Sequence, residues 1–332
     1  VPGLSYAASR TTLRIGSFNI QVFGEAKIKK PFIRQTVLSI ISRYDIIFIQ
    51  EIRDDKNKAI YELLAELNKG TGRNYQALVS ARLGRGEMKE QYAYFFDSNL
   101  LAATESYVYR DVRDDFSREP FIARFKGQGR TFTMAGIHIA PTNVLGELKA
   151  LNGVYRDAAQ HFGDDNIFFM GDFNADCGYY KPVADGFDFF DVNPRLRVSN
   201  EEDTTVAPTS CAYDRVLGFG DIQKYSSDAH AFNFMEKFGY DIGNSRLVSD
   251  HFPIEFTINS TGTLAETTPI PSVEQPASEP GKASENPKDP VIAPAPTGQG
   301  TSCGSDIYKT PGGYCYASFM NTKKRVSATC CL

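Results

Sequence analysis

The sequence predicts a layered α/β or α+β domain, with β-sheets in the centre and helices outside them. Short, continuously apolar runs such as residues 46–49 are typical of strands that are covered on both faces. Apolar residues at helical spacing, for example within residues 33–44, alternate with these runs. The 332 residues are enough for one large domain or two ordinary ones, and 42% are hydrophobic, so most of the chain can bury a core.

The expected elements follow each other along the first 260 residues. Helical spacing predicts two helices, and short apolar runs predict the strands around them. In chain order, the sequence predicts a strand over residues 13–20, a helix over 33–44, strands over 45–51 and 131–139, a helix over 145–162, and strands over 166–173 and 252–258.

Composition divides the chain into three parts. Residues 261–300 hold eight prolines and no aromatic residue, so they cannot form a core and are typical of an extended, flexible linker. We therefore expect a large domain over residues 1–260 and a separate small module over residues 301–332. This module is too short for an ordinary hydrophobic core and needs disulfides to hold it together.

The six cysteines fall into the same parts, two in the large domain and four in the module. Even numbers in both parts favour disulfides and an oxidising compartment. Zinc is the alternative for the last four, but adjacent cysteines are a poor spacing for zinc ligands, and no histidine lies nearby. The chain also begins at Val1 rather than Met, so we expect a secreted protein whose signal peptide has been removed. The cysteines expected to pair among themselves, in one of three connectivities, are Cys303, Cys315, Cys330 and Cys331.

Polar side chains stand at the ends of the predicted strands. A residue that can bind a metal or move a proton follows each apolar run, and ligands often gather at strand ends in layered α/β folds. These residues are Asn19, Glu51, His138, Asp172, Asn174, Asp214, Asp250 and His251. A single Asp or Asn after a strand is ordinarily a turn residue or a helix cap. Agreement among six strand ends instead predicts a site that these residues form together.

The residue types in this set indicate a reaction. Carboxylate and amide oxygens are hard ligands that suit Mg²⁺, Mn²⁺ or Ca²⁺ better than zinc. Two of the four histidines in the chain belong to the set, and a histidine beside a carboxylate is a natural general acid or base near neutral pH. The combination predicts attack of water on a phosphate ester, with a metal stabilising charge on the phosphoryl oxygens.

Eight stretches of the sequence occur in an order that is highly specific to one family. They read LRIGSFNIQVFGEAK, YDIIFIQEIRD, LGRGEMKEQYAYFF, FSREP, GIHIAP, MGDFNADC, CAYDR and SDHFPIE. Residues 12–259 thereby resemble the deoxyribonuclease I family, within the larger endonuclease/exonuclease/phosphatase fold, whereas the linker and the module do not. The resemblance implies a four-layered α/β sandwich with two packed mixed β-sheets. It also implies endonucleolytic cleavage of double-stranded DNA to 5′-phosphorylated products.

The resemblance further implies roles for individual residues. The acid and base histidines, each with a carboxylate that orients it, would be His138, His251, Glu90 and Asp214. The residues that hold divalent metal (Mg²⁺ or Mn²⁺) and the scissile phosphate would be Glu51, Asp172, Asn174, Asp250 and Asn19. The residues that contact DNA would be Arg53, Arg118 and Tyr179.

Structural features follow from the same resemblance. Cys177 and Cys211 match the structural disulfide of the family. Two segments resemble calcium-binding loops, in which Ca²⁺ would make the loop rigid rather than take part in chemistry. Their residues are Asp203, Thr205 and Thr209 in one segment, and Asp114, Phe116 and Glu119 in the other.

The sequence departs from the family at positions that bear on partners. Gln21 stands where relatives have an arginine, Met88 replaces a tyrosine that lies in the minor groove, and a small disulfide before FSREP is missing. These changes predict weaker binding in the minor groove but unchanged chemistry. Ala77 stands where the vertebrate pancreatic enzyme offers a tyrosine to actin, so we expect that actin does not bind.

The C-terminal module is basic and rich in aromatic residues. Cations bind phosphates and rings stack on bases, so Lys323, Lys324 and Arg325 with the interleaved rings suit nucleic acid. On a flexible linker, such a module would raise the effective affinity of the chain for DNA. A small module with ordinary surface charge, or one that binds carbohydrate or a cell surface, is the alternative.

The sequence therefore predicts a secreted, monomeric, metal-dependent endonuclease that prefers duplex DNA. We expect no membrane span, since no apolar run is long enough. Two alternatives are a phosphodiesterase or phosphatase of the same superfold that acts on a lipid or inositol phosphate, and a catalytically inactive DNA-binding protein. The stretches FSREP, NADC and CAYDR argue against the first. The intact acid, base and carboxylate set argues against the second.

Overall fold

The computed structural model describes residues 11–87, 89–181 and 187–259, and the backbone of three short strands in the C-terminal module. The chain divides into two compact units, Val1–Thr268 and Pro269–Leu332. The strands of the second unit form one antiparallel sheet: β13 (Ile307–Lys309), β14 (Cys315–Phe319) and β15 (Thr322–Arg325). Outside the described residues lie Met88, the segment 261–300, Cys303, Cys330 and Cys331, together with the side chains of Cys315, Lys323, Lys324 and Arg325.

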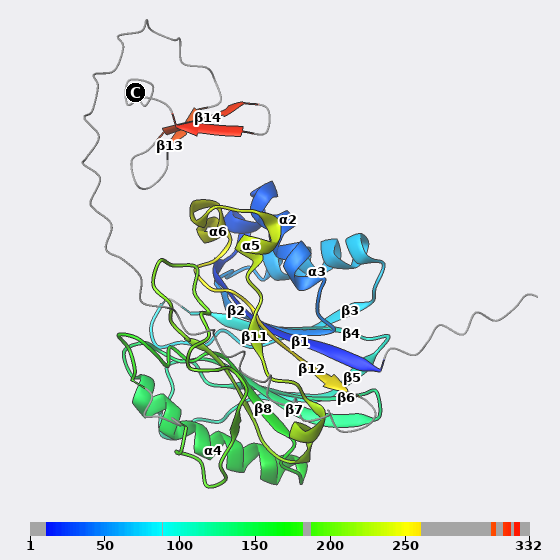
Figure 1. The fold of residues 1–332 in the computed structure, drawn as a ribbon. Helices are drawn as coiled ribbons and strands as arrows, with labels where there is room; N and C mark the ends of the chain where they lie inside the picture. Colours follow the sequence, from blue (N-terminus) through cyan, green and yellow to red (C-terminus); the bar gives the residue numbers. More distant parts are fainter. Residues whose placement is uncertain are drawn as a thin grey trace, which may run out of the picture. The chain divides into compact units, whose positions relative to one another are not determined.

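Two six-stranded mixed sheets form the centre of the first unit (Figure 1). The first sheet has the strand order β11-β12-β1-β2-β4-β3: β11 (His230–Ala231), β12 (Ile254–Asn259), β1 (Thr12–Phe23), β2 (Ile46–Ile52), β4 (Gln91–Asp97) and β3 (Tyr75–Val79). The second has the order β5-β6-β7-β8-β10-β9: β5 (Leu101–Val108), β6 (Phe121–Gly127), β7 (Arg130–His138), β8 (Ile167–Asp172), β10 (Asp214–Gly218) and β9 (Arg195–Leu196).

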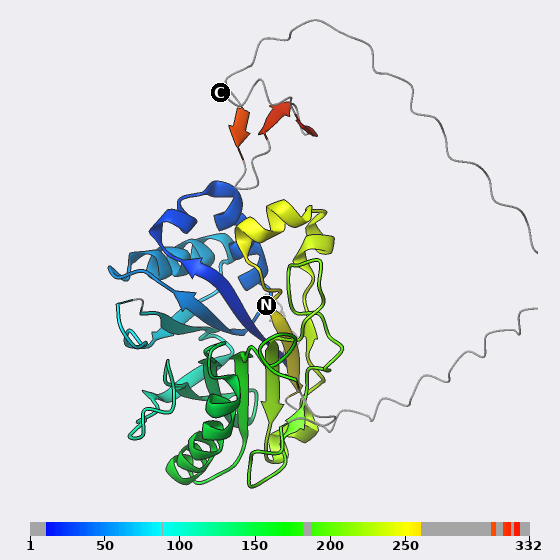
Figure 2. The ribbon, with the colours of Figure 1, turned by 90° about the vertical axis from the view of Figure 1, so that its left-hand side faces the viewer.

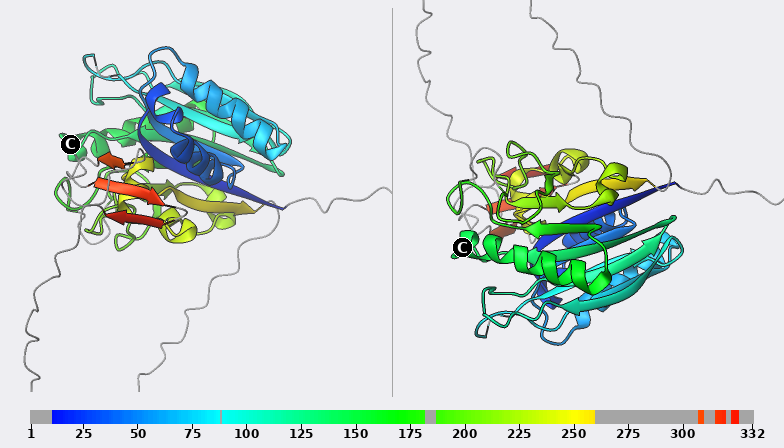
Figure 3. Two further views of the ribbon diagram at one scale, coloured as in Figure 1. Left: turned by 90° about the horizontal axis from the view of Figure 1, so that it is seen from above. Right: turned by 90° about the horizontal axis from the view of Figure 1, so that it is seen from below.

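Helices cover the outer face of each sheet. The helices are α1 (Glu25–Ile28), α2 (Pro31–Ile41), α3 (Lys58–Thr71), α4 (Val144–Phe162), α5 (Phe234–Phe238), α6 (Ile242–Val248) and the 3₁₀ helix η1 (Asp221–Tyr225). Figures 2 and 3 show α2 and α3 on one side of the stacked sheets and α4 on the other. The predicted four-layered α/β sandwich with two packed mixed sheets is therefore confirmed. Over the described residues, no helix is long and apolar enough to cross a membrane.

Local sequence explains where these helices begin and end. Pro31 opens α2 at the first helical position, where its missing N–H costs nothing. Gly72 and Gly163 end α3 and α4 in the left-handed conformation, with φ of 65° and 73°. The helix predicted over residues 33–44 stops at Ile41, because the chain turns there and buries the Tyr44 ring completely.

The two sheets approach each other closely in the middle of the sandwich. At Gly136 of β7, a Cβ atom would lie 2.3 Å from the Phe48 ring of β2, so only glycine fits there. The buried Tyr94 hydroxyl of β4 also crosses between the sheets and donates to the carbonyls of Phe121 (3.0 Å) and Met134 (3.2 Å). Tight packing of this kind makes the sandwich a rigid support for groups at its edge.

Strand direction brings distant parts of the chain to one edge of the sandwich. The pairs β1–β2 and β7–β8 are parallel, whereas β12 is antiparallel to β1 and β10 is antiparallel to β8. The ends of β1, β2, β7 and β8 therefore share this edge with the beginnings of β10 and β12, and β4 begins there too, directly after Glu90. The prediction of six strand ends was wrong for two positions: Asp214 is the first residue of β10, and His251 precedes β12. Antiparallel strands enter the sheet where parallel strands leave it, so the same edge results.

Candidate active site

The predicted polar residues gather at this shared edge of the two sheets. Asn19 and Glu51 come from the first sheet, and Asp172 from the second. Asp250 has a half-exposed side chain, with 38% of it accessible. The remaining residues of the set are buried, exposed by 9% or less: Asn19, Glu51, Glu90, His138, Asp172, Asn174, Asp214 and His251. So many buried polar groups require partners, and these partners define the site.

The first acid–base pair joins His138, the last residue of β7, to Glu90. His138 Nδ1 lies 3.1 Å from Glu90 Oε2. Arg53 Nη2 lies 2.8 Å from Glu90 Oε1, and Arg118 Nε lies 3.6 Å from Glu90 Oε2. Burial alone would raise the pKa of Glu90, but the hydrogen bond with His138 and the charges of His138, Arg118 and Arg53 lower it to about 2. Glu90 is therefore ionised at neutral pH and fixes the orientation of the imidazole.

The main chain of His138 is held as firmly as its ring. Its N–H donates to the Tyr92 hydroxyl at 2.9 Å. Its carbonyl oxygen accepts from Arg118 Nε at 3.1 Å and from Arg118 Nη2 at 3.0 Å. The ring is thus fixed by a carboxylate, and its backbone by a phenol and a guanidinium.

The second acid–base pair joins His251 to Asp214, the first residue of β10. His251 Nδ1 lies 2.7 Å from Asp214 Oδ2, and the Asp214 N–H donates to Thr204 Oγ1 at 3.1 Å. Burial raises the pKa of Asp214 to about 6, although His251 acts against this. Burial opposes charge on His251 as well, but the carboxylates of Asp214 and Asp172 outweigh it and raise the pKa of His251 well above its ordinary value. The pair therefore holds a proton at neutral pH.

Both imidazoles point to the same oxygen of Asp172. Asp172 Oδ2 lies 3.4 Å from His138 Nε2 and 3.5 Å from His251 Nε2. Neighbouring strands set this arrangement, because His138 and Asp214 are each opposite Asp172 in the strand register. The Nε2 atoms of two oriented histidines therefore lie near one common oxygen, as a reaction that needs both an acid and a base requires.

Asn19 and Glu51 form an oxygen-rich corner beside Asp172. Asn19 Nδ2 lies 3.1 Å from Glu51 Oε1 and 3.1 Å from Asp172 Oδ2, and the Val22 N–H donates to Glu51 Oε2 at 2.9 Å. Glu51 and Val22 have φ of 58° and 53°, which are uncommon values for residues other than glycine. Strain of this kind at a cluster of carboxylates is typical of functional sites.

Asn174 reaches the site by a route different from the predicted one. The sequence predicted a strand over residues 166–173, but β8 ends at Asp172 and Asn174 has φ of 49°. In the tight turn that results, the Asn174 N–H donates to Asp172 Oδ1 at 2.9 Å and Asn174 Nδ2 donates to the Ile139 carbonyl at 2.9 Å. Asn174 therefore lies beside Asp172 because of this turn and not because it belongs to the strand.

The predicted DNA-contacting residues of the large domain lie at or near the same edge. Arg53 has a side chain that is 31% exposed, and Arg53 Nη2 lies 3.1 Å from Glu51 Oε2. Arg118 is more buried, with 14% of its side chain exposed. Tyr179 is 51% exposed, and its ring lies 5.4 Å from the ring of Tyr213.

The disulfide of the large domain is confirmed: Cys177 and Cys211 are bonded across 34 residues. In the first segment that resembles a calcium loop, Thr205 Oγ1 lies 2.9 Å from Asp203 Oδ1 and 3.1 Å from the Thr209 carbonyl. In the second segment, the Asp114 side chain is 76% exposed and pairs with an arginine, Phe116 is buried, and Glu119 is half-buried. Within the described ranges, no three His, Cys, Asp or Glu side chains are grouped to hold a metal ion.

Several residues of the site were missed by sequence reasoning. Gln50 joins the two sheets, because its Nε2 donates to Ser17 Oγ at 3.0 Å and its Oε1 accepts from the Asp172 N–H at 2.7 Å. The Tyr92 hydroxyl accepts from the His138 N–H, and Thr204 Oγ1 accepts from the Asp214 N–H, so each supports one of the two acid–base pairs. A glutamine that ends an apolar strand was a usable signal for Gln50, whereas nothing local to Tyr92 or Thr204 reveals partners so distant along the chain.

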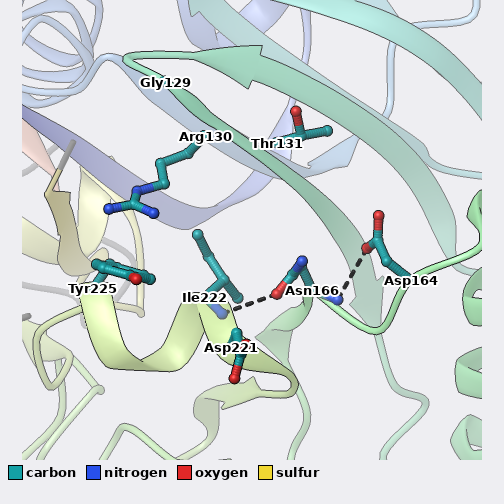
Figure 4. Close-up of a pocket in the computed structure, with 8 residues that line it drawn as sticks. All are labelled: Gly129, Arg130, Thr131, Asp164, Asn166, Asp221, Ile222 and Tyr225. Carbon is teal, nitrogen blue, oxygen red and sulfur yellow. Dashed lines mark hydrogen bonds between the residues drawn. The ribbon is translucent and has the colours of Figure 1, made fainter. Parts of the chain in front are cut away.

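Two cavities of about 310 Å³ lie apart from this site. One lies at the beginning of β7, where Arg130 Cζ is 3.4 Å from the centre of the Tyr225 ring (Figure 4). The other is lined by Arg195, Leu196, Arg197, Ser199, Glu202, Asp228, Ala229 and His230. Neither cavity is lined by a residue of the acid–base pairs, so both lie outside the candidate active site.

Comparisons with known proteins agree with this geometry. The Endonuclease/Exonuclease/phosphatase family matches residues 16–251. The chain is 36% identical over 268 residues to Deoxyribonuclease-1 of Gallus gallus, and this match covers 75% of this chain and 93% of the relative. It is 32% identical over 288 residues to Deoxyribonuclease-1-like 2 of Homo sapiens, covering 76% and 94%. A solved structure of humanised D. rerio TDP2 with 14 mutations has a TM-score of 0.53 at 15% identity, covering 75% of this chain and all of that one, and shows the fold alone.

Proposed function

This chain belongs to the deoxyribonuclease I family, within the Endonuclease/Exonuclease/phosphatase family, and on this premise we propose that it is a deoxyribonuclease. It cleaves phosphodiester bonds inside DNA, prefers the duplex, and leaves 5′-phosphorylated products. The observation that carries the proposal is the convergence of two carboxylate-oriented histidines on one oxygen of Asp172, at 3.4 and 3.5 Å.

The two histidines suit the two proton transfers of hydrolysis. Water must lose a proton as it attacks phosphorus, and the departing 3′-oxygen must gain one. His138 and His251 present Nε2 toward a common point while Glu90 and Asp214 hold Nδ1 of each ring. One imidazole accepts the proton from water, and the other supplies the proton to the leaving oxygen.

The oxygen-rich corner fits a divalent cation such as Mg²⁺ or Mn²⁺. Magnesium is commonly held by one or two carboxylates together with substrate phosphate oxygens rather than by a complete protein cage. Glu51 and Asp172 offer two carboxylates around Asn19, and the buried Asp250 Oδ1 has no hydrogen-bond partner within the described part of the chain. These residues and Asn174 would hold the metal and the scissile phosphate. The metal supplies stabilisation of the negative charge on the phosphoryl oxygens.

The surroundings of the site support the remaining features of the proposal. Arg53 and Arg118 place positive charge beside the acid–base pairs, where a DNA phosphate would lie, and Tyr179 exposes a ring nearby. Secretion is supported by the disulfide between Cys177 and Cys211, since such bonds persist in oxidising compartments. We further propose that Ca²⁺ stabilises the segment 203–209 and that the enzyme acts as a monomer without actin.

The proposal assigns separate tasks to the parts of the chain. Residues 1–260 carry the chemistry, residues 261–300 act as a flexible linker, and residues 301–332 bind DNA weakly through basic and aromatic side chains. A tethered second site would raise the effective affinity for DNA without any new contact at the active site. Deleting residues 261–332 tests this: weaker DNA retention and slower cleavage at moderate salt are expected, and unchanged behaviour at low and moderate salt would refute it.

Plasmid nicking tests the main proposal. Supercoiled plasmid is incubated with the intact chain in Mg²⁺ and Ca²⁺, with and without chelator, and in parallel with His138→Ala. We expect nicking by the intact chain only in the presence of metal, and loss of nicking in the variant. His161→Ala is the matched control, because His161 is an exposed histidine on α4 that pairs with Glu105.

Two results would contradict the proposal. Absence of nicking by the intact chain in metal would exclude deoxyribonuclease activity. Nicking by His138→Ala at the rate of the intact chain would leave the activity in place but remove His138 from the proton transfers.

A further inference from the structure

Glu147 is a buried carboxylate that the acid–base pairs do not use. It lies in the first turn of α4 and is 0% exposed. Its Oε1 accepts from the Ser117 N–H at 3.0 Å, and its Oε2 accepts from the Ala140 N–H at 3.2 Å. Each carboxylate oxygen is thus committed to the main chain of a different segment, and neither segment belongs to α4.

The two segments that Glu147 joins both lead to His138. Ser117 precedes Arg118, whose guanidinium donates twice to the His138 carbonyl, at 3.1 and 3.0 Å. Ala140 follows His138 by two residues on the other side. Glu147 is therefore linked to the His138 main chain in two ways. One link passes through Ser117 and the neighbouring Arg118, and the other passes through Ala140.

This arrangement requires a side chain at position 147 that accepts a hydrogen bond on each of its two terminal atoms, as an ionised carboxylate does. Both partners are backbone N–H donors, so the side chain at position 147 must accept on both of its terminal atoms. Burial raises the pKa of Glu147, while the two N–H donors, the side chain of Ser117 and the charge of Arg118 act in the opposite direction. A position in the first turn of a helix also favours negative charge. Glutamine has nearly the same shape but would turn an NH₂ group toward one of the two N–H donors.

We propose that Glu147 is a positioning residue that fixes the His138 main chain and the Arg118 guanidinium relative to each other for the hydrolytic step. The expected effect on kcat rests on the proposed function, whereas the expected effect on the position of His138 does not. Glu147 does not touch the reacting groups. It acts through Arg118 and through the end of β7.

Glu147→Gln tests the proposal in two independent measurements. In DNA cleavage, kcat is expected to fall by about 10-fold or more while KM changes less than about twofold, because alignment of an acid–base group affects the transition state more than binding. In NMR spectra, the ring signals of His138 are expected to shift while those of His251 stay in place. Four histidines in the whole chain make this comparison practicable.

Matched controls separate positioning from general destabilisation. Lys149→Gln changes an exposed residue on the same helix and is expected to alter neither kcat nor the histidine signals. If Glu147→Gln does not fold, Glu147→Asp shortens the side chain that reaches both N–H donors and must give the same His138-specific shift; unchanged His138 signals in that variant would overturn the inference.

The outcomes distinguish this inference from the proposed function. An intact chain that does not cleave DNA refutes the proposed function, and the His138 signals still decide the positioning role. Unchanged His138 signals in folded Glu147→Gln would overturn the inference. So would a fall in kcat no larger than the loss of folded protein.

Discussion

Glu90→Gln probes the charge cluster that orients His138. Lowering the pKa of Glu90 from its ordinary value of 4.5 to about 2 corresponds to about 3 kcal/mol of preferential stabilisation of the ionised form in the folded protein. The glutamine variant loses this term and leaves Arg53 and Arg118 without their buried carboxylate. At pH 7 and with chelator present, we expect its free energy of unfolding to be lower by about 3 kcal/mol.

The pH dependence of this difference has a definite sign. The folded pKa of Glu90 lies below the unfolded one, so its contribution is complete above pH 4.5 and is lost as the pH falls toward 2. The difference between the original chain and Glu90→Gln should therefore shrink to about 2 kcal/mol at pH 3.5. Urea unfolding followed by circular dichroism at several pH values measures it.

A matched control and a kinetic measurement complete the experiment. Glu62→Gln removes an exposed carboxylate from α3 and should change the free energy of unfolding by less than about 0.5 kcal/mol at every pH. Plasmid cleavage by Glu90→Gln should be slower by about 10²-fold, because its His138 imidazole is no longer oriented. A stability difference below about 1 kcal/mol, or one that does not change with pH, would refute the assignment of this energy to the ionised Glu90.

Three further perturbations have definite expectations. Asp214→Asn removes the negative partner 2.7 Å from His251, so plasmid nicking should fall by about 10²-fold or more while circular dichroism spectra stay unchanged; nicking at the original rate would exclude the pairing. Replacing Cys177 and Cys211 by serine opens a loop closed across 34 residues and should cost about 4 kcal/mol in urea unfolding, and an undiminished stability would contradict this. Gly136→Ala places a methyl group 2.3 Å from the Phe48 ring of the facing sheet and should lower the free energy of unfolding by about 1–3 kcal/mol, as measured in urea. A neutral result there would mean that the sheets can separate slightly.

Sequence reasoning predicted the layers and drew attention to polar residues that lie together in the structure, because both depend on local patterns. Apolar runs and helical spacing located β7, β8 and α4 to within about two residues, and the polar residues that follow the parallel strands were found with them. Strand direction was not predictable in this way. An apolar run looks the same whether it enters or leaves the sheet, so Asp214 and His251 were expected at ends and lie at beginnings.

Residues that support the site from a distance were beyond sequence reasoning for a different reason. Gln50 binds the Asp172 N–H across 122 positions, and Glu147 binds two loops whose proximity exists only after β7 has paired with its neighbours. No periodicity encodes such contacts, because they depend on the register between strands and on the packing of one sheet on the other. Gln50 and Glu147 are both polar and fully buried, and their burial is visible in the structure but cannot be read from the composition of the chain.

The geometry of the acid–base pairs depends on the packing of two sheets. His138 and Asp214 are neighbours of Asp172 within the second sheet, so their spacing is fixed by strand register. His251 instead precedes β12 of the first sheet, and its distance of 3.5 Å from Asp172 Oδ2 spans the interface. Gln50 and the Gly136 contact hold that interface. A substitution that moves the sheets apart should therefore weaken the contact of His251 with Asp172 and leave that of His138 intact, so the two histidines can be separated experimentally by changes that touch neither of them.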